Sequence, residues 1–170
     1  HAKSRYCIYN GLYESGLAAL EQLTALCQAT GENQLLVQVH LQYIYYGIQI
    51  YDVAMMEEHL KAGKALLEGQ ERSESYGIYQ RLEGLLEQMQ GNYQEARDLL
   101  YRSIHTLESL VPSSNDRYAI NIAGAYNYIA ECCRLEGRYE EAFGYYDKAI
   151  IHNRSRGYYP GAAVFYTNYG

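Results

Sequence analysis

The sequence predicts an all-α fold built from consecutive helical hairpins, and three observations support this prediction. Apolar residues recur at intervals of three and four along most of the chain, which places them on one face of an α-helix. Only 2 of the 170 residues are proline, and the helix-breaking clusters are few and evenly placed. A six-residue pattern, Gly-x-Tyr-x-x-Ala, also recurs along the chain. A recurring unit of this kind is typical of stacked helical repeats.

The six-residue pattern is expected to mark the tight turn of each hairpin. It reads GNYQEA at 91–96 and GRYEEA at 137–142, and at 11–16 it reads GLYESG, with glycine replacing the alanine. A weaker copy, QIYDVA, occupies 49–54, so the four tyrosines are 38, 42 and 46 residues apart. Glycine permits the left-handed backbone that ends a helix. We expect the tyrosine to pack back over the turn and the alanine to let the two helices approach closely.

A buried stripe is expected in the helix that follows each turn. The four stripes are Gly16, Leu20, Leu23 and Cys27; Met56, Leu60, Gly63 and Leu67; Ala96, Leu100, Ile104 and Leu107; and Ala142, Tyr146, Ala149, Ile150 and Asn153. An amphipathic helix also precedes each turn, and in the last full repeat its stripe contains Ile122, Tyr126, Ile129 and Cys133. This pattern divides the chain into repeats over about 1–30, 32–69, 73–111 and 115–156, with a partial fifth repeat over 160–170.

The segment AGAYNYIAECCRLEGRYEEAFGYYDKAI, residues 123–150, resembles a tetratricopeptide repeat (TPR). It matches that motif in register at an aromatic position, at a large residue followed by a small one, and at the glycine, tyrosine and alanine of the turn. The motif usually has a proline after the second helix, where this chain has Arg154. The resemblance implies a right-handed superhelical solenoid of antiparallel helix pairs, forming a single array over residues 1–170. The repeats of this chain are longer than the 34 residues of the plain TPR motif. Repeats stretched in this way resemble the helical sensor regions of bacterial transcriptional regulators, either MalT-like or of the bacterial transcriptional activation domain type. We also expect the chain to be a fragment of a longer protein, because stacked repeats need capping helices.

Composition and charge narrow the classes of partner. The net charge is −6, whereas a segment that contacts nucleic acid directly should present a basic face. No apolar run reaches the length of about 18–20 residues needed to span a membrane. The four cysteines, Cys7, Cys27, Cys132 and Cys133, contain no CxxC pair, so we expect buried thiols and a reducing, cytoplasmic location.

No catalytic or metal-binding motif is recognisable in the sequence. The glycine-rich phosphate loops, the nucleophile elbow and the HExxH zinc motif are all missing from it. The histidines are scattered, and we interpret His59, which follows Glu57 and Glu58, as part of a solvated helix face. We therefore expect a protein without enzymatic activity and without a cofactor or metal ion.

The candidate binding residues lie on the first helix of each repeat, because TPR-like arrays bind partners along the concave surface formed by these helices. In the last full repeat the positions facing this groove are Asn127, Glu131 and Arg134, which lie on one helical face. An ordinary solvated face remains the alternative.

In the third repeat the register of the groove is ambiguous. Counting from Gly91 places Arg81 and Gln88 in the groove, whereas counting from the apolar stripe places Gln80 and Glu87 there.

In the second repeat, tyrosines are the candidates. Anchoring the repeat on Gln49 exposes Tyr43 and Tyr46, whereas anchoring it on Gly47 buries Tyr43. Tyrosine is enriched at ligand-binding surfaces but also covers helix–helix contacts, so both roles stay open for Tyr43, Tyr45 and Tyr46 and for Tyr158 and Tyr159.

These observations favour a binding or sensing module of a larger cytoplasmic regulatory protein, such as a regulator of transcription. Its expected partners are a protein, a peptide or a small-molecule effector in the groove, together with neighbouring domains of the full-length chain. Two alternatives remain: a peptide-binding scaffold without a sensing role, and a structural spacer.

Overall fold

The computed structural model describes residues 10–110 and 118–155, and within these ranges every regular element is an α-helix, which confirms the all-α prediction. The helices are α2 (Tyr13–Thr30), α3 (Asn33–Ile50), α4 (Val53–Leu66), α5 (Glu74–Met89), α6 (Tyr93–Ser109), α7 (Ala119–Leu135) and α8 (Tyr139–Ser155). The first helix of the first repeat, Tyr158, Tyr159 and the partial fifth repeat lie outside the described residues.

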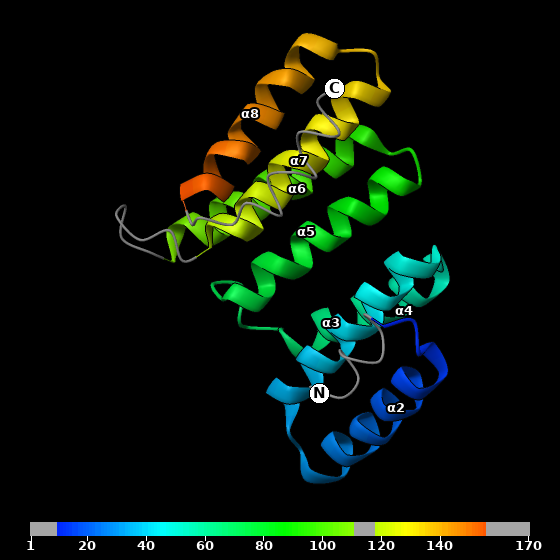
Figure 1. The fold of residues 1–170 in the computed structure, drawn as a ribbon. Helices are drawn as coiled ribbons and strands as arrows, with labels where there is room; N and C mark the ends of the chain where they lie inside the picture. The colour runs from blue at the N-terminus through cyan, green and yellow to red at the C-terminus, as the bar shows by residue number, and fades with distance from the viewer. Residues whose placement is uncertain (1–9, 111–117, 156–170) are drawn as a thin grey trace. The chain divides into compact units, whose positions relative to one another are not determined.

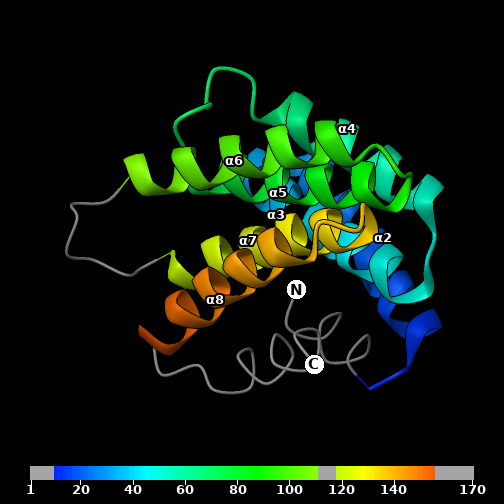
Figure 2. The ribbon, with the colours of Figure 1, turned by 90° about the horizontal axis from the view of Figure 1, so that it is seen from above.

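The chain divides into two compact units between Gly69 and Gln70. The first unit contains α2, α3 and α4, and the second contains α5, α6, α7 and α8. The division falls between the second and third predicted repeats. Within the second unit, α5 pairs with α6 and α7 pairs with α8, and α6 also packs on α7 (Figures 1 and 2).

The hairpin turns form where the recurring sequence pattern predicts them. A left-handed residue stands at Gly11, Tyr51, Gly91 and Gly137, each just before a helix that begins within two residues. In the third repeat the N–H of Asn92 donates to the carbonyl of Glu87 at 2.9 Å, and the turns after α3 and α7 repeat this bond. This bond is the one that closes a helix in the Schellman motif.

The turn of the second repeat differs from the prediction in its register. The sequence pattern aligns Tyr51 with the tyrosines of the other copies, but Tyr51 itself adopts the left-handed conformation, with φ of 57°, and so takes the place of the glycine. Val53 begins the following helix, as Tyr93 does in the third repeat. The left-handed residues are thus 40, 40 and 46 residues apart.

The predicted buried stripes are confirmed, whereas the predicted packing of the turn tyrosines is not, since Tyr13 and Tyr51 are 38% and 82% exposed. Leu20, Met56, Leu100 and Ala142 are each at most 1% exposed. Tyr139, by contrast, is 60% exposed, so it does not pack back over its turn. It begins α8, where the small Ala142, one turn later, makes the close contact with α7 instead.

The thiols of the described cysteines, Cys27, Cys132 and Cys133, are free and buried, as predicted, whereas Cys7 lies outside the described residues. Burial raises the pKa of Cys132 to about 12, so this thiol stays protonated and unreactive at neutral pH. Among the described residues, no helix combines the length and apolar character needed to cross a membrane.

Replacing Tyr51 by glycine should stabilise the protein by about 1 kcal/mol. The left-handed backbone costs an L-residue about 1–2 kcal/mol, part of which the greater freedom of glycine in the unfolded chain offsets. The side chain of Tyr51 is 82% exposed, so little packing is lost. Urea denaturation followed by circular dichroism would measure the change. Tyr51→Ala is the matched control, because it removes the ring but keeps the backbone strain; equal stabilisation by both variants would contradict this account.

Candidate binding face on α5 and α7

The first helices of the third and fourth repeats, α5 and α7, contact each other through Arg81. Its guanidinium lies over the ring of Tyr128, with Cζ 5.8 Å from the ring centroid. Nη1 lies 3.3 Å from the point that a Cβ of Gly124 would occupy, so the missing side chain of Gly124 makes room for the arginine. Arg81 therefore sits on the side of α5 that faces the next repeat.

The residues that the alternative register of the third repeat places in the groove, Gln80 and Glu87, do not face α7. Gln80 accepts a hydrogen bond from Thr106 Oγ1 at 2.9 Å, so it faces α6, the second helix of its own hairpin. Glu87 accepts a hydrogen bond from Asn92 Nδ2 at 2.8 Å and so belongs to the turn. The orientation of these side chains agrees with counting from Gly91, the residue that adopts the left-handed conformation.

Glu131 and Arg134 form an ion pair on α7, and α8 anchors it. Arg134 donates to Glu131 Oε2 from Nη2 at 2.7 Å and from Nε at 3.1 Å. The other carboxylate oxygen of Glu131 accepts a hydrogen bond from the hydroxyl of Tyr146, a fully buried side chain. The bonds to Glu131 raise the pKa of Arg134, while burial and the bond to Glu131 raise the pKa of Tyr146. The exposed guanidinium is thus a permanent, oriented cation.

The other predicted residues of this face are less accessible than Arg134, and Arg81 is only 8% exposed. Asn127 is only 7% exposed. Gln88 is half-buried, and its Oε1 atom is buried without accepting a hydrogen bond from the described part of the chain. A buried acceptor without a donor costs about 1–3 kcal/mol, and because this atom is buried, a ligand on the surface does not reach it in this structure.

The structure places Tyr43 and Tyr46 in the core of the first unit. Both belong to the cluster around Leu20 and Cys27, and the ring of Tyr46 lies 5.4 Å from that of Tyr13. The left-handed Tyr51 corresponds to Gly137 of the last full repeat. Counting back from these two residues, the equivalents of Asn127, Glu131 and Arg134 are Leu41, Tyr45 and Ile48. Sequence reasoning grouped Tyr45 with Tyr43 and Tyr46 but did not place it at a groove position, because it aligned Tyr51 with tyrosine rather than with glycine. Ligand binding by Tyr43 and Tyr46 stays a prediction, but their burial favours packing.

The interpretation of His59 as part of a solvated face is wrong. Its Nδ1 atom lies 2.8 Å from Nδ1 of His40, and its ring stacks on Tyr43 with centroids 4.0 Å apart. Packing of α4 on α3 brings the two histidines together, although 19 residues separate them in the chain. Burial lowers the pKa of His40, and burial and the neighbouring His40 lower the pKa of His59 to about 4. Among the described residues, no third potential metal ligand joins this pair.

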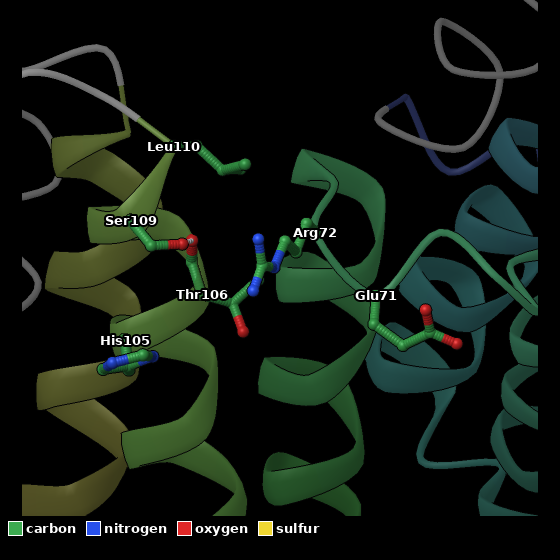
Figure 3. Close-up of a pocket in the computed structure, with 6 residues that line it drawn as sticks. All are labelled: Glu71, Arg72, His105, Thr106, Ser109 and Leu110. Carbon is green, nitrogen blue, oxygen red and sulfur yellow. Dashed lines mark hydrogen bonds between the residues drawn. The ribbon is translucent and has the colours of Figure 1, made fainter.

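A cavity of about 400 Å³ opens where α5 begins and α6 ends. Figure 3 shows Arg72 directed toward Thr106 and Ser109 of α6, while Glu71 points away from them. The hydroxyl of Ser109 donates to the carbonyl of Thr106, and the hydroxyl of Thr106 donates to Gln80, so both are already engaged. Sequence reasoning did not select these residues, and the only signal was the polar loop at 68–75. The cavity presents Arg72 and His105 but no converging catalytic group.

A scan of the chain against models of protein families gives no match, and a search of curated protein sequences finds none either. The functional argument therefore depends on the geometry of the described residues.

Proposed function

We propose that this protein is a non-enzymatic binding module of a larger cytoplasmic regulatory protein, such as a regulator of transcription, and that it binds its ligand or partner against α5 and α7. The observation that carries this proposal is the exposed guanidinium of Arg134, which Glu131 and the buried Tyr146 hold in position. A fixed guanidinium suits a carboxylate or phosphate group, because its donors form two parallel hydrogen bonds.

The hairpin architecture supports this location. Consecutive TPR-like repeats place their first helices side by side, and the contact of Arg81 with α7 fits such an arrangement. In a sensing role, a bound ligand would shift the packing of the array against neighbouring domains, which requires different affinities for two states.

A peptide-binding scaffold without a sensing role is the second candidate. The exposed guanidinium of Arg134 suits this candidate as well, because a carboxylate of an extended peptide would accept hydrogen bonds from it.

Arg134→Ala should weaken ligand binding about tenfold or more without unfolding the protein, because a charge-assisted hydrogen bond contributes about 1.5–3 kcal/mol. The measurement is a thermal-shift screen with sugars, nucleotides, amino acids and acidic peptides, in which a ligand at about 100 times its Kd adds roughly 2.7 kcal/mol. Arg102→Ala, which removes an exposed arginine of α6, is the matched control. A small-molecule ligand lost only with Arg134→Ala supports sensing, and a peptide ligand supports the scaffold. A ligand whose binding both variants retain would contradict the proposed face.

A further inference from the structure

Three tyrosines from three different helices form a cluster that includes none of the residues of the Glu131–Arg134 ion pair. They are Tyr101 of α6, Tyr126 of α7 and Tyr145 of α8, and α7 packs against both of the other helices (Figures 1 and 2). The ring centroids of Tyr126 and Tyr145 are 6.4 Å apart, with 17° between the ring planes. The ring of Tyr101 meets that of Tyr145 edge-on at 6.3 Å. We call these residues the tyrosine cluster.

The tyrosine cluster is held in place but is not sealed from solvent. The hydroxyls of Tyr101 and Tyr145 are hydrogen-bonded to each other, which fixes two of the three rings. The ring of His152 stacks on Tyr126 at 5.5 Å and supports the third. Tyr101 is 42% exposed, and Tyr126 and Tyr145 are half-buried, so a ligand can reach the rings.

The ammonium group of Lys148 already lies against this cluster. Its Nζ atom is 4.9 Å from the ring centroid of Tyr145 and 5.5 Å from that of Tyr126. Both distances are within the range of about 6 Å at which the negative face of an aromatic ring attracts a cation. Lys148 is an exposed, flexible side chain, so it can move away without disturbing the helix.

The electrostatics around the cluster also suit a cation. Burial raises the pKa of Tyr126, and the carboxylate of Glu108 on α6 raises it further, which shows that a negative charge acts on this ring. Burial and the bond to Tyr145 raise the pKa of Tyr101, so its phenol is neutral at physiological pH and the hydrogen bond between the tyrosines persists.

We propose that the tyrosine cluster is a binding site for an organic ammonium group, and that Lys148 occupies this site in the unliganded protein. The ligand class is an alkylammonium, either a small quaternary ammonium molecule or the lysine or methylated lysine side chain of a peptide. Two nearly parallel rings and an edge-on third ring present aromatic surface to such a group. The lysine that already lies there shows that a cation fits. This site is separate from the α5–α7 face and does not depend on the proposed function.

The test compares choline with 3,3-dimethylbutan-1-ol, its uncharged analogue of the same shape, in titrations of the whole chain at constant ionic strength. Tyrosine fluorescence and calorimetry would follow binding. Because Lys148 competes for the site, Lys148→Ala should bind choline about tenfold more tightly than the wild type. Lys148→Arg is the matched control, since it keeps a cation against the rings and should bind no more tightly than the wild type.

A second variant tests the rings themselves. Adding Tyr145→Leu to Lys148→Ala should remove most of the choline affinity, and circular dichroism would verify that the double variant is folded. If it does not fold, the comparison of Lys148→Ala with Lys148→Arg still decides the proposal. Equal binding of choline and the uncharged alcohol, or no gain in affinity with Lys148→Ala, would overturn it.

The source of the ammonium group is then assigned with a third titration. Acetyl-lysine amide, acylated only at its α-amine, and its trimethylated form represent a peptide side chain. Tighter binding of either compound than of choline to Lys148→Ala would assign the site to a peptide, and the reverse order would assign it to a small molecule. Binding of none of the three ammonium compounds to Lys148→Ala would overturn the proposal.

Discussion

Gly84→Ala is expected to destabilise the protein by up to about 2 kcal/mol, although alanine is the better helix former. A Cβ at this position would lie 2.8 Å from Cγ of Leu100 and 3.0 Å from the backbone oxygen of Ala96. The leucine could turn, but the backbone oxygen belongs to α6 and cannot move without separating the helices of the hairpin. Overpacking of this kind costs about 1–3 kcal/mol. Replacing glycine by alanine in a helix gains about 1 kcal/mol in helix propensity, which offsets only part of an overpacking cost near 3 kcal/mol.

Gly144→Ala is the matched control, and it should have the opposite sign. Gly144 lies in the interior of α8, and a Cβ there would meet nothing within 4 Å. Only the gain in helix propensity then applies, so stability should rise by up to about 1 kcal/mol. Chemical denaturation of both variants measures the difference. Stabilisation by Gly84→Ala would show that α5 and α6 do not pack as closely as described.

Lowering the pH from 7 to 4 should destabilise the first unit through the pair formed by His40 and His59. Burial lowers the pKa of both rings, that of His59 to about 4, against 6.5 in the unfolded chain. The unfolded chain therefore binds more protons in this window, so the contribution is complete above pH 6.5 and is lost as the pH falls toward 4. The expected loss is about 2 kcal/mol, because solvent screens the half-buried ring and reduces the full linkage value.

His59→Phe is the control for this pH dependence. Phenylalanine keeps a ring against Tyr43 but cannot take up a proton, so the variant should lose less stability between pH 7 and pH 4. The carboxylate of Glu58 raises both pKa values, and the ring of Tyr43 packs against His59. Denaturant titrations at a series of pH values give the difference between the two proteins. Identical pH profiles would contradict the role of the histidine pair.

Sequence reasoning located the hairpins well because their signals are local. Leu100 and Met56 were placed in buried stripes from spacing alone, and both are fully buried. A left-handed glycine followed by an amphipathic helix is a property of a few consecutive residues, so it needs no knowledge of distant contacts. The register error at Tyr51 arose where a tyrosine, which seldom adopts this backbone, took the position of a glycine.

The candidate binding face was predictable only in part. The positions of Glu131 and Arg134 on one face of a helix follow from helical spacing, but the hydroxyl of Tyr146 that completes their network comes from the neighbouring helix. The burial of Arg81 against Gly124 also depends on how α5 meets α7. Helical spacing predicts which residues share one face of a helix, but it does not predict which neighbouring helix packs against that face.

The helical class, three of the four turns and the buried stripe of each second helix can be predicted from the amino-acid sequence, because periodicity and glycine act over a few residues. Which side chains from different helices meet depends on the tertiary structure. It brought His59 to His40 and Lys148 to Tyr126, and it left Tyr139 exposed. These outcomes depend on the packing of whole helices against one another, and no local pattern in the chain encodes the distance between two side chains on different helices.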